Sequence, residues 1–202
     1  MSGSGLPRLG RRGQPSARAW RVDAAGRVKA ARQLGSPNFD ERPEGARVEL
    51  LVIHNISLPP GQFGGPGVID LFLNRLDAAA HPYYREIAGL RVSSHFFIRR
   101  DGELIQFVPC TKRAWHAGQS EWRGRTRCND FSIGVELEGA DDLPFADIQY
   151  EMLASLATAL LAAYPIMDCA GHSDIARPLG RKTDPGPLFD WALFRRLLAG
   201  PG

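Results

Sequence analysis

The sequence feature that most constrains the fold is a run of apolar and β-branched residues at positions 48–53, VELLVI. A run that is almost continuously apolar predicts a strand buried on both faces of a sheet, so other layers must cover both sides. His54 follows at the carboxyl end of this strand, where ligand sites of α/β sheets tend to lie. The next residues, NISLPPGQFGGPG, hold too much proline and glycine for regular structure. We therefore expect a cleft beside His54, with this segment as one wall.

Further patterns along the chain predict additional strands and helices. Residues 132–138 alternate, with the apolar residues on one face and both glutamates on the other. Apolar residues at helical spacing predict a helix over 147–164, ended by Pro165. The remaining expected elements are a hairpin of strands 95–99 and 103–108, a helix at 68–75, a binding-side loop at 115–129, a strand at 165–170 and a helix at 189–198. This order predicts a single α/β domain with a mixed central β-sheet flanked by helices.

The size and composition are those of one ordinary globular domain. The chain has 202 residues, of which 44% are hydrophobic and 23% charged, and no run approaches the roughly 18 apolar residues of a membrane span. The N-terminus lacks the apolar core of a signal peptide. Three cysteines, an odd number with no tight pair, fit a reducing compartment better than a disulfide framework. We therefore expect a cytoplasmic protein with no membrane contact, and nothing points to an obligate protein partner.

The net charge of +3 is unevenly distributed. Residues 1–32 hold eight basic residues and one acid, which leaves 17 basic and 21 acidic residues in the remainder. The sequence pI near 9.0 therefore reflects the N-terminal segment and does not indicate a nucleic-acid-binding domain. Residues 1–17 are expected to form a disordered basic extension before a folded domain over 18–202. An anionic partner for this extension is the alternative.

Two histidines and an aspartate could form a metal site. His54 and His172 each lie where a predicted strand runs into a Gly/Pro-rich loop. Taken singly, such a histidine is more often a hydrogen-bonded strand-end residue than a ligand, and Asp184 lies in the good turn sequence Thr-Asp-Pro-Gly. Two imidazoles and a carboxylate nevertheless suit a zinc ion with one open position. The residues alone leave both interpretations open.

Two strand glutamates and a lysine could act at such a site. Glu136 and Glu138 share a face, with Cα atoms roughly 6–7 Å apart, so periodicity does not choose between them. Both could equally be solvated carboxylates on an exposed face. Lys182 precedes Asp184 by two residues, and in an extended segment both side chains would point the same way. Alone, Lys182 would be a surface lysine.

Several long runs of the sequence resemble one enzyme family. VIHNISLPPGQFGGPG, RVSSHFFIRRDGELIQFVP, KRAWHAG, RCNDFSIGVELEG and GRKTDPGPLFDW occur in one order between about Trp20 and the C-terminus. They are similar to the cytoplasmic zinc-dependent N-acetylmuramyl-L-alanine amidases of bacterial wall recycling, the AmpD type. The resemblance implies a peptidoglycan-recognition/amidase-like fold. It also implies hydrolysis of the amide bond between (1,6-anhydro-)N-acetylmuramic acid and the L-alanine of the stem peptide, with an anhydromuropeptide as substrate.

The resemblance implies roles for the residues that could carry the chemistry. It assigns His54, His172 and Asp184 to Zn²⁺, which lowers the pKa of a bound water and so supplies a nucleophile at neutral pH. Glu136 would take the proton and deliver it to the departing amine, and Lys182 would stabilise the tetrahedral oxyanion. One departure from the family pattern is the connection between His172 and Lys182, which is about two residues longer here. This leaves the position of Lys182 open.

Five further residues are candidates for substrate contacts. Asn55, Arg91 and Arg127 match positions that in the family contact muramyl and peptide groups, and an acidic stem peptide suits such arginines. Trp115 and His116 could form an apolar and hydrogen-bonding surface for a sugar. Core packing is the alternative for Trp115.

Other function classes fit the sequence less well. A catalytically silent peptidoglycan-recognition module is the main alternative, but such modules typically lack part of the zinc set. A zinc peptidase acting on proteins would need HExxH or another helix-borne motif, which this chain does not contain. A nucleophilic cysteine is disfavoured because no cysteine lies in a recognisable activating context.

Overall fold

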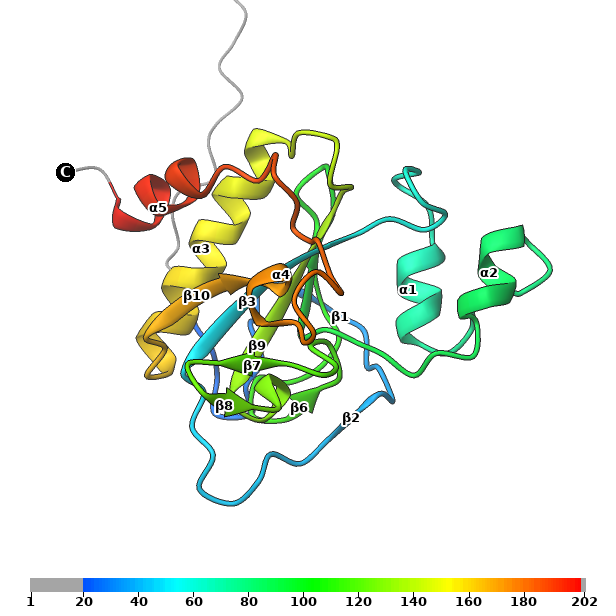
Figure 1. The fold of residues 1–202 in the computed structure, drawn as a ribbon. Coiled ribbons are helices and arrows are strands. Elements are labelled where there is room, and N and C mark those ends of the chain that lie inside the picture. Colours follow the sequence, from blue (N-terminus) through cyan, green and yellow to red (C-terminus); the bar gives the residue numbers. More distant parts are fainter. Residues whose placement is uncertain (1–19, 201–202) are drawn as a thin grey trace, which may run out of the picture.

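A six-stranded β-sheet is the centre of the computed structural model, which describes residues 20–200 (Figure 1). Its strands are β1 (Arg32–Gln33), β3 (Leu50–Ile56), β4 (Phe96–Ile98), β5 (Leu104–Gln106), β9 (Ser132–Glu138) and β10 (Asp168–Gly171). The strand order is β1-β5-β4-β9-β3-β10. Strands β4, β9, β3 and β10 run parallel, whereas β5 is antiparallel to β4. The predicted mixed central sheet is confirmed.

Two helices cover one face of the sheet. They are α3 (Asp147–Ala163) and α5 (Trp191–Ala199), which lie side by side (Figure 1). The buried side chains of α3, including Leu153 and Leu160, share one core with Ile133, Val135 and Leu137 of β9. Because β9 alternates, its other side chains, including both glutamates, point to the opposite face.

The opposite face is covered by short elements and loops. They are α1 (Gly67–Phe72), α2 (Pro82–Ile87), α4 (His172–Ile175), the 3-10 turn η1 (Cys128–Asp130) and the two-stranded pairs β2 (Phe39–Asp40) with β6 (Arg113–Ala114) and β7 (Glu121–Trp122) with β8 (Arg125–Thr126). One core joins α1 to β4 and β5, and another joins η1 and α4 to β3 and β10. The site therefore forms on the face that short segments cover, and the long helices brace the sheet from behind.

The pairing of the parallel strands places chemically important residues at one edge. His54 of β3 pairs with Glu136 of β9. On the other side of β3, Ile53 pairs with Gly171, so His172 follows directly after β10 at the same level. Carboxyl ends of parallel strands meet at one edge of a sheet, which explains why residues far apart in sequence converge there.

Several predicted boundaries differ from the structure. Strand β3 continues to Ile56 because it stays paired with β9 as far as Glu138, so His54 lies inside the strand and not at its end. The bounds 132–138 are confirmed. Strand β10 begins at Asp168 and not at 165, and the two long helices are displaced by one or two residues at their ends.

Some elements left no usable signal in the sequence. The segment predicted as a loop at 115–129 contains the β7–β8 pair and part of η1, so that prediction was partly wrong. Helix α2 was not predicted; its first residues are Pro82, which suits the first helical turn, and Tyr83, whose N–H donates to His81. The expected basic extension over residues 1–17 lies outside the described residues. None of the helices between residues 20 and 200 is long and apolar enough to cross a membrane.

Candidate active site

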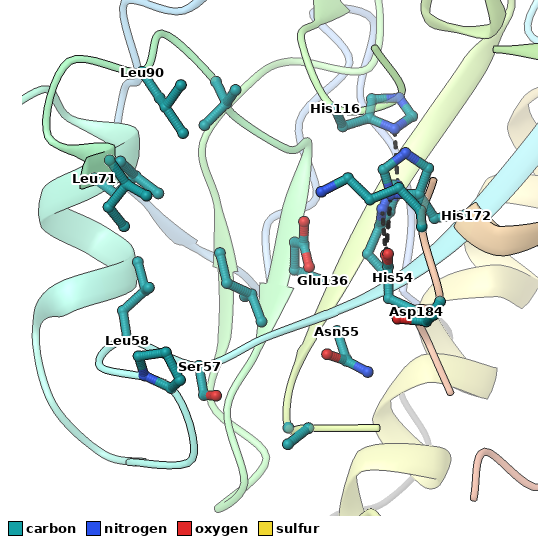
Figure 2. Close-up of a pocket in the computed structure, with 18 of the residues that line it drawn as sticks. His54, Asn55, Ser57, Leu58, Leu71, Leu90, His116, Glu136, His172 and Asp184 are labelled. Atoms are coloured by element: carbon teal, nitrogen blue, oxygen red, sulfur yellow. Dashed lines mark hydrogen bonds and ion pairs between the residues drawn. The ribbon is translucent and has the colours of Figure 1, made fainter. Parts of the chain in front are cut away.

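A cavity of about 610 Å³ opens where β3, β9 and β10 end. Its polar end is lined by His54, Glu136, His172, Lys182 and Asp184. Its other end is apolar, and Figure 2 shows this wall facing the polar cluster. The wall includes Leu58, Leu71, Phe72, Ile87, Leu90 and Val92. A few polar groups that converge beside an apolar wall are typical of a small-molecule site.

Three donor atoms of the polar end converge on one point. The Nδ1 atoms of His54 and His172 each lie 3.1 Å from Oδ2 of Asp184 (Figure 2). All three donor atoms lie within 4.8 Å of one another. The backbone supports this geometry, since the N–H of Ser173 donates to the carbonyl of Asp184 over 2.9 Å. Such separations suit a tetrahedral ion with ligand distances of roughly 2.0–2.2 Å.

The chemistry of the donor set provides a test of whether a cation fits there. The Nε2 of His172 lies 3.1 Å from the carbonyl oxygen of Ala117, which can only accept, so Nε2 carries the proton. A metal ion bound by the unprotonated Nδ1 of His172 and by Oδ2 of Asp184, which lie 3.1 Å apart, would satisfy both of these acceptor atoms. The residues therefore fit the zinc that the family resemblance implies.

The surroundings keep the ligand groups in their metal-binding forms. Burial, reinforced by the neighbouring His172, lowers the pKa of His54 to about 4, so its imidazole is neutral at physiological pH. Burial alone would raise the pKa of Asp184, but without a metal ion the hydrogen bonds from the rings of His172 and His54 outweigh burial and hold that pKa below its usual value. Neutral imidazole and ionised carboxylate are the forms that coordinate metals.

Glu136 is a buried carboxylate with an unpartnered oxygen. Only 8% of the residue is exposed, and its Oε2 has no hydrogen-bond partner among the described residues. Burial and the negative charge of Asp184 raise the pKa of Glu136 well above its usual value, against the opposing charge of Lys182. A carboxyl group with a raised pKa holds its proton to higher pH than an exposed glutamate, as suits a general acid/base.

Glu138 has a different role, although it shares the face of Glu136. Its Oε1 accepts from the N–H of Gly64 over 2.6 Å, its Oε2 accepts from the N–H of Arg100 over 3.0 Å, and the same oxygen lies 3.8 Å from the guanidinium of Arg99. The carboxylate is only 4% exposed. The alternative that both glutamates are solvated is therefore wrong, and Glu138 holds the loop that walls the cavity.

Lys182 reaches the cavity in spite of the longer preceding loop. The neighbouring Arg181 anchors that loop by donating to the carbonyl oxygens of Gln119, at 2.8 Å, and Ala117, at 3.2 Å. Ala117 is also the acceptor for His172, so one carbonyl connects the loop to a predicted ligand. The positive charge of Lys182 lowers the pKa values of both His54 and Glu136. Arg181 was not predicted, although it lies in the run GRKTDPGP.

The predicted substrate residues are divided between the cavity and the outer surface. Asn55, Trp115 and His116 line the cavity, whereas Arg91 and Arg127 do not. The amide of Asn55 donates to Oδ1 of Asp141 over 2.7 Å and to the carbonyl of Pro185. Asp141, which orients this amide, carried no signal in the sequence. Trp115 is half-buried and lines the cavity.

The two arginines have surface positions. Arg91 is exposed, and its guanidinium donates to the carbonyl oxygens of Gly89 and Leu90 in its own segment. The side chain of Arg127 is 69% exposed and pairs with Asp130 at 3.2 Å. A contact between either arginine and a substrate therefore requires the substrate to extend beyond the cavity.

Comparison with known proteins identifies the family. Residues 44–187 match the N-acetylmuramoyl-L-alanine amidases, and the chain belongs to this family of amide hydrolases. It is 56% identical over 176 residues to the 1,6-anhydro-N-acetylmuramyl-L-alanine amidase AmpD of Escherichia coli K12. The aligned region covers 86% of this chain and 95% of that protein. The expected amidase activity is confirmed, and the silent recognition module is not supported.

Solved structures show the same fold. The crystal structure of a selenomethionine AmpD derivative matches with a TM-score of 0.83 and 55% identity, covering 86% of this chain and 97% of the other. A complex of the amidase AmiD from E. coli with anhydro-N-acetylmuramic acid-L-Ala-D-γ-Glu-L-Lys matches with a TM-score of 0.54 and 31% identity, covering 78% of this chain and 60% of the other. The predicted amidase-like α/β fold is confirmed.

Proposed function

We propose that this amidase cleaves the bond between the lactyl carbonyl of 1,6-anhydro-N-acetylmuramic acid and the L-alanine of the stem peptide. The observation that carries the proposal is the buried, unpartnered carboxyl of Glu136 beside the converging donor atoms of His54, His172 and Asp184. The substrate follows from the likeness to AmpD of E. coli. The role is the recycling of soluble fragments of the cell wall.

Zinc is the proposed metal. The donor set of two imidazoles and one carboxylate is that of catalytic zinc sites, which leave the fourth position open. When bound, zinc supplies Lewis-acid chemistry that activates water and polarises a carbonyl. The three ligands come from β3, the start of α4 and the loop after it, and hydrogen bonds to backbone groups support both His172 and Asp184.

Glu136 and Lys182 are the proposed catalytic residues. Glu136 accepts a proton from the attacking water and passes it to the nitrogen of the departing L-alanine. Its burial prepares it for this exchange because its pKa lies well above that of an exposed glutamate. Lys182 lines the same end of the cavity and provides a positive charge toward the oxyanion that develops on the carbonyl oxygen.

The apolar wall is proposed to bind the sugar end of the substrate. The half-buried ring of Trp115 offers a flat surface, and the leucines of the wall exclude water from the reacting bond. Asn55 presents its amide oxygen to the cavity, since its NH₂ group already donates to Asp141. Arg91 and Arg127 remain proposed partners for carboxylates of the stem peptide. We place the enzyme in the cytoplasm. Its three free cysteines suit a reducing compartment, and soluble wall fragments imported there would be its substrates.

The decisive experiment compares two glutamine variants on one substrate. Purified zinc-loaded protein is incubated with anhydromuropeptide, and the products are weighed by mass spectrometry. Glu136→Gln should lower kcat by at least roughly 100-fold while zinc content stays stoichiometric. Glu138→Gln is the matched control, and it should keep kcat near the wild-type value because its carboxylate holds a loop. Activity in Glu136→Gln, or products that do not contain free anhydromuramic acid, would contradict the proposal.

A further inference from the structure

We infer that His116 is a positioning residue that fixes the ring of His54 with its proton on Nε2, leaving Nδ1 free to bind the metal. The inference rests on the proposed zinc site. His116 lies in the loop after β6 and is only 9% exposed. Its two ring nitrogens connect His54 to Ser132 at the start of β9, so a predicted ligand is linked to the backbone of the sheet.

The contacts form one continuous chain. Nε2 of His54 lies 2.9 Å from Nδ1 of His116, and Nε2 of His116 lies 3.2 Å from Oγ of Ser132. The chain ends at a backbone carbonyl, because Oγ of Ser132 also lies 2.6 Å from the oxygen of Cys128. His54 and His116 meet edge to face, with an interplanar angle of 89° and centroids 5.0 Å apart.

The carbonyl at the end of this chain of contacts fixes the direction of every hydrogen bond in it. The carbonyl of Cys128 can only accept, so the single hydroxyl hydrogen of Ser132 points to it. Oγ of Ser132 must then accept from Nε2–H of His116. A neutral His116 has no second proton, so its Nδ1 accepts from Nε2–H of His54. His54 therefore presents an unprotonated Nδ1 to the point where Asp184 and His172 converge.

The opposite direction is unfavourable. It would need a proton on both nitrogens of His116, and therefore a positive charge on a buried ring that has three other imidazoles and the guanidinium of Arg42 nearby. An uncompensated buried charge is far less stable than a neutral hydrogen-bonded group. The chain thus permits one arrangement, in which both predicted histidine ligands carry their proton on Nε2.

Gly134 makes the position of the His116 ring possible. A Cβ at residue 134 would lie 2.6 Å from both Cγ and Nδ1 of that ring. The N–H of Gly134 in turn donates to Nδ1 of His95 over 3.1 Å, which holds this part of β9 in place. The ring is therefore seated directly on the strand that carries Glu136, and both of its nitrogens are already engaged.

The first test measures the protons directly. Long-range ¹H–¹⁵N correlation spectra of the zinc-loaded, ¹⁵N-labelled wild-type protein distinguish protonated from bare ring nitrogens. We expect a proton on Nε2 of His54 and on Nε2 of His116, with a bare Nδ1 on His116. A proton on Nδ1 of His116 would overturn the inference. Failure of the protein to cleave muropeptide would contradict the proposed function but would leave this result unchanged.

The second test asks whether the chain strengthens zinc binding. Zinc affinity is measured by competition with a chromophoric chelator. His116→Leu should weaken it about 10- to 100-fold, as expected for loss of a partner behind a metal ligand. His116→Gln should retain most of the affinity, because its amide can accept from His54 and donate to Ser132. Equal losses in the two variants, or none in His116→Leu, would contradict the inference.

A serine pair keeps the test independent of any failure of the His116 variants to fold. Ser132→Ala removes the acceptor that orients His116 and should weaken zinc binding. Ser94→Ala is the matched control, since Ser94 is also fully buried but its Oγ has no partner among the described residues. The same zinc affinity in both serine variants would show that the chain does not orient His54.

Discussion

At the scale of single residues, the fold destabilises the ionised form of one carboxyl group in the site, that of Glu136. Glu136 is buried next to Asp184, and its Oε2 makes no hydrogen bond among the described residues. Its ionised form is therefore disfavoured in the folded protein and not in the unfolded chain. Residues that serve catalysis often reduce stability in this way.

The raised pKa of Glu136 predicts a pH-dependent stability difference. An unfolded glutamate ionises at a pKa near 4.3, whereas the folded one holds its proton to higher pH. Between these pKa values the folded state binds more protons, so the metal-free protein loses stability as pH rises. Glu136→Gln should remove this loss and raise the Tm at pH 7 by about 2–4 °C, equivalent to about 1 kcal/mol. Thermal unfolding between pH 4 and 8 measures it, and a lower Tm in the variant would contradict it.

Arg127 provides a second prediction at the residue scale. Charge-assisted hydrogen bonds contribute about 1.5–3 kcal/mol each. If this exposed arginine binds a stem-peptide carboxylate, Arg127→Ala should lower kcat/KM roughly 10- to 150-fold on an acidic muropeptide, with zinc binding unchanged. A neutral, amidated peptide should be affected less. Equal losses on the two substrates would exclude the carboxylate role.

At the scale of elements, one half-buried arginine connects the segments that surround the site. The guanidinium of Arg42 donates to the carbonyl oxygens of Cys110, Asn129, Asp130 and Ser132, at distances between 2.8 and 3.3 Å. These carbonyls belong to the loop before β6, to η1 and to the start of β9. Burial lowers the pKa of Arg42 to about 10, yet it remains charged at neutral pH.

Loss of this connection should destabilise the whole domain. Arg42→Met removes the donors and leaves several buried carbonyls unsatisfied, which should cost about 3 kcal/mol. The corresponding fall in Tm is about 6–12 °C. Chemical and thermal unfolding of the zinc-loaded protein measure it. The exposed Arg85 is the control, and a similar loss in Arg85→Met would mean that the effect is not specific to the half-buried position.

At the scale of the whole molecule, the sheet, its covering helices and the site all lie within residues 20–200. The basic segment before them is expected to be dispensable because its composition cannot bury a core. Deletion of residues 1–17 should leave turnover, zinc affinity and Tm nearly unchanged. A large fall in any of the three would indicate that this segment packs on the domain or contributes to the cavity.

The five longer strands of the described residues were predictable from the sequence, whereas the two-residue strands β1, β2, β6, β7 and β8 were not. The alternation in 132–138 predicted both the bounds of β9 and the face of its glutamates, because a strand has a period of two residues. Other features were not accessible to periodicity. Strand β3 is extended by its pairing with β9, and α4 is a single turn next to His172.

By itself, the sequence determined an α/β domain, a buried strand that leads to His54 and, through long matching runs, the amidase family. Strand periodicity could not separate Glu136 from Glu138, and only the family resemblance pointed to Glu136. The tertiary structure shows how the two differ, because other segments bring different groups to each. Glu138 accepts from two backbone N–H groups, and Glu136 lies beside the charge of Asp184. The role proposed for His116 likewise depends on the tertiary structure, because its hydrogen-bond partners come from separate segments.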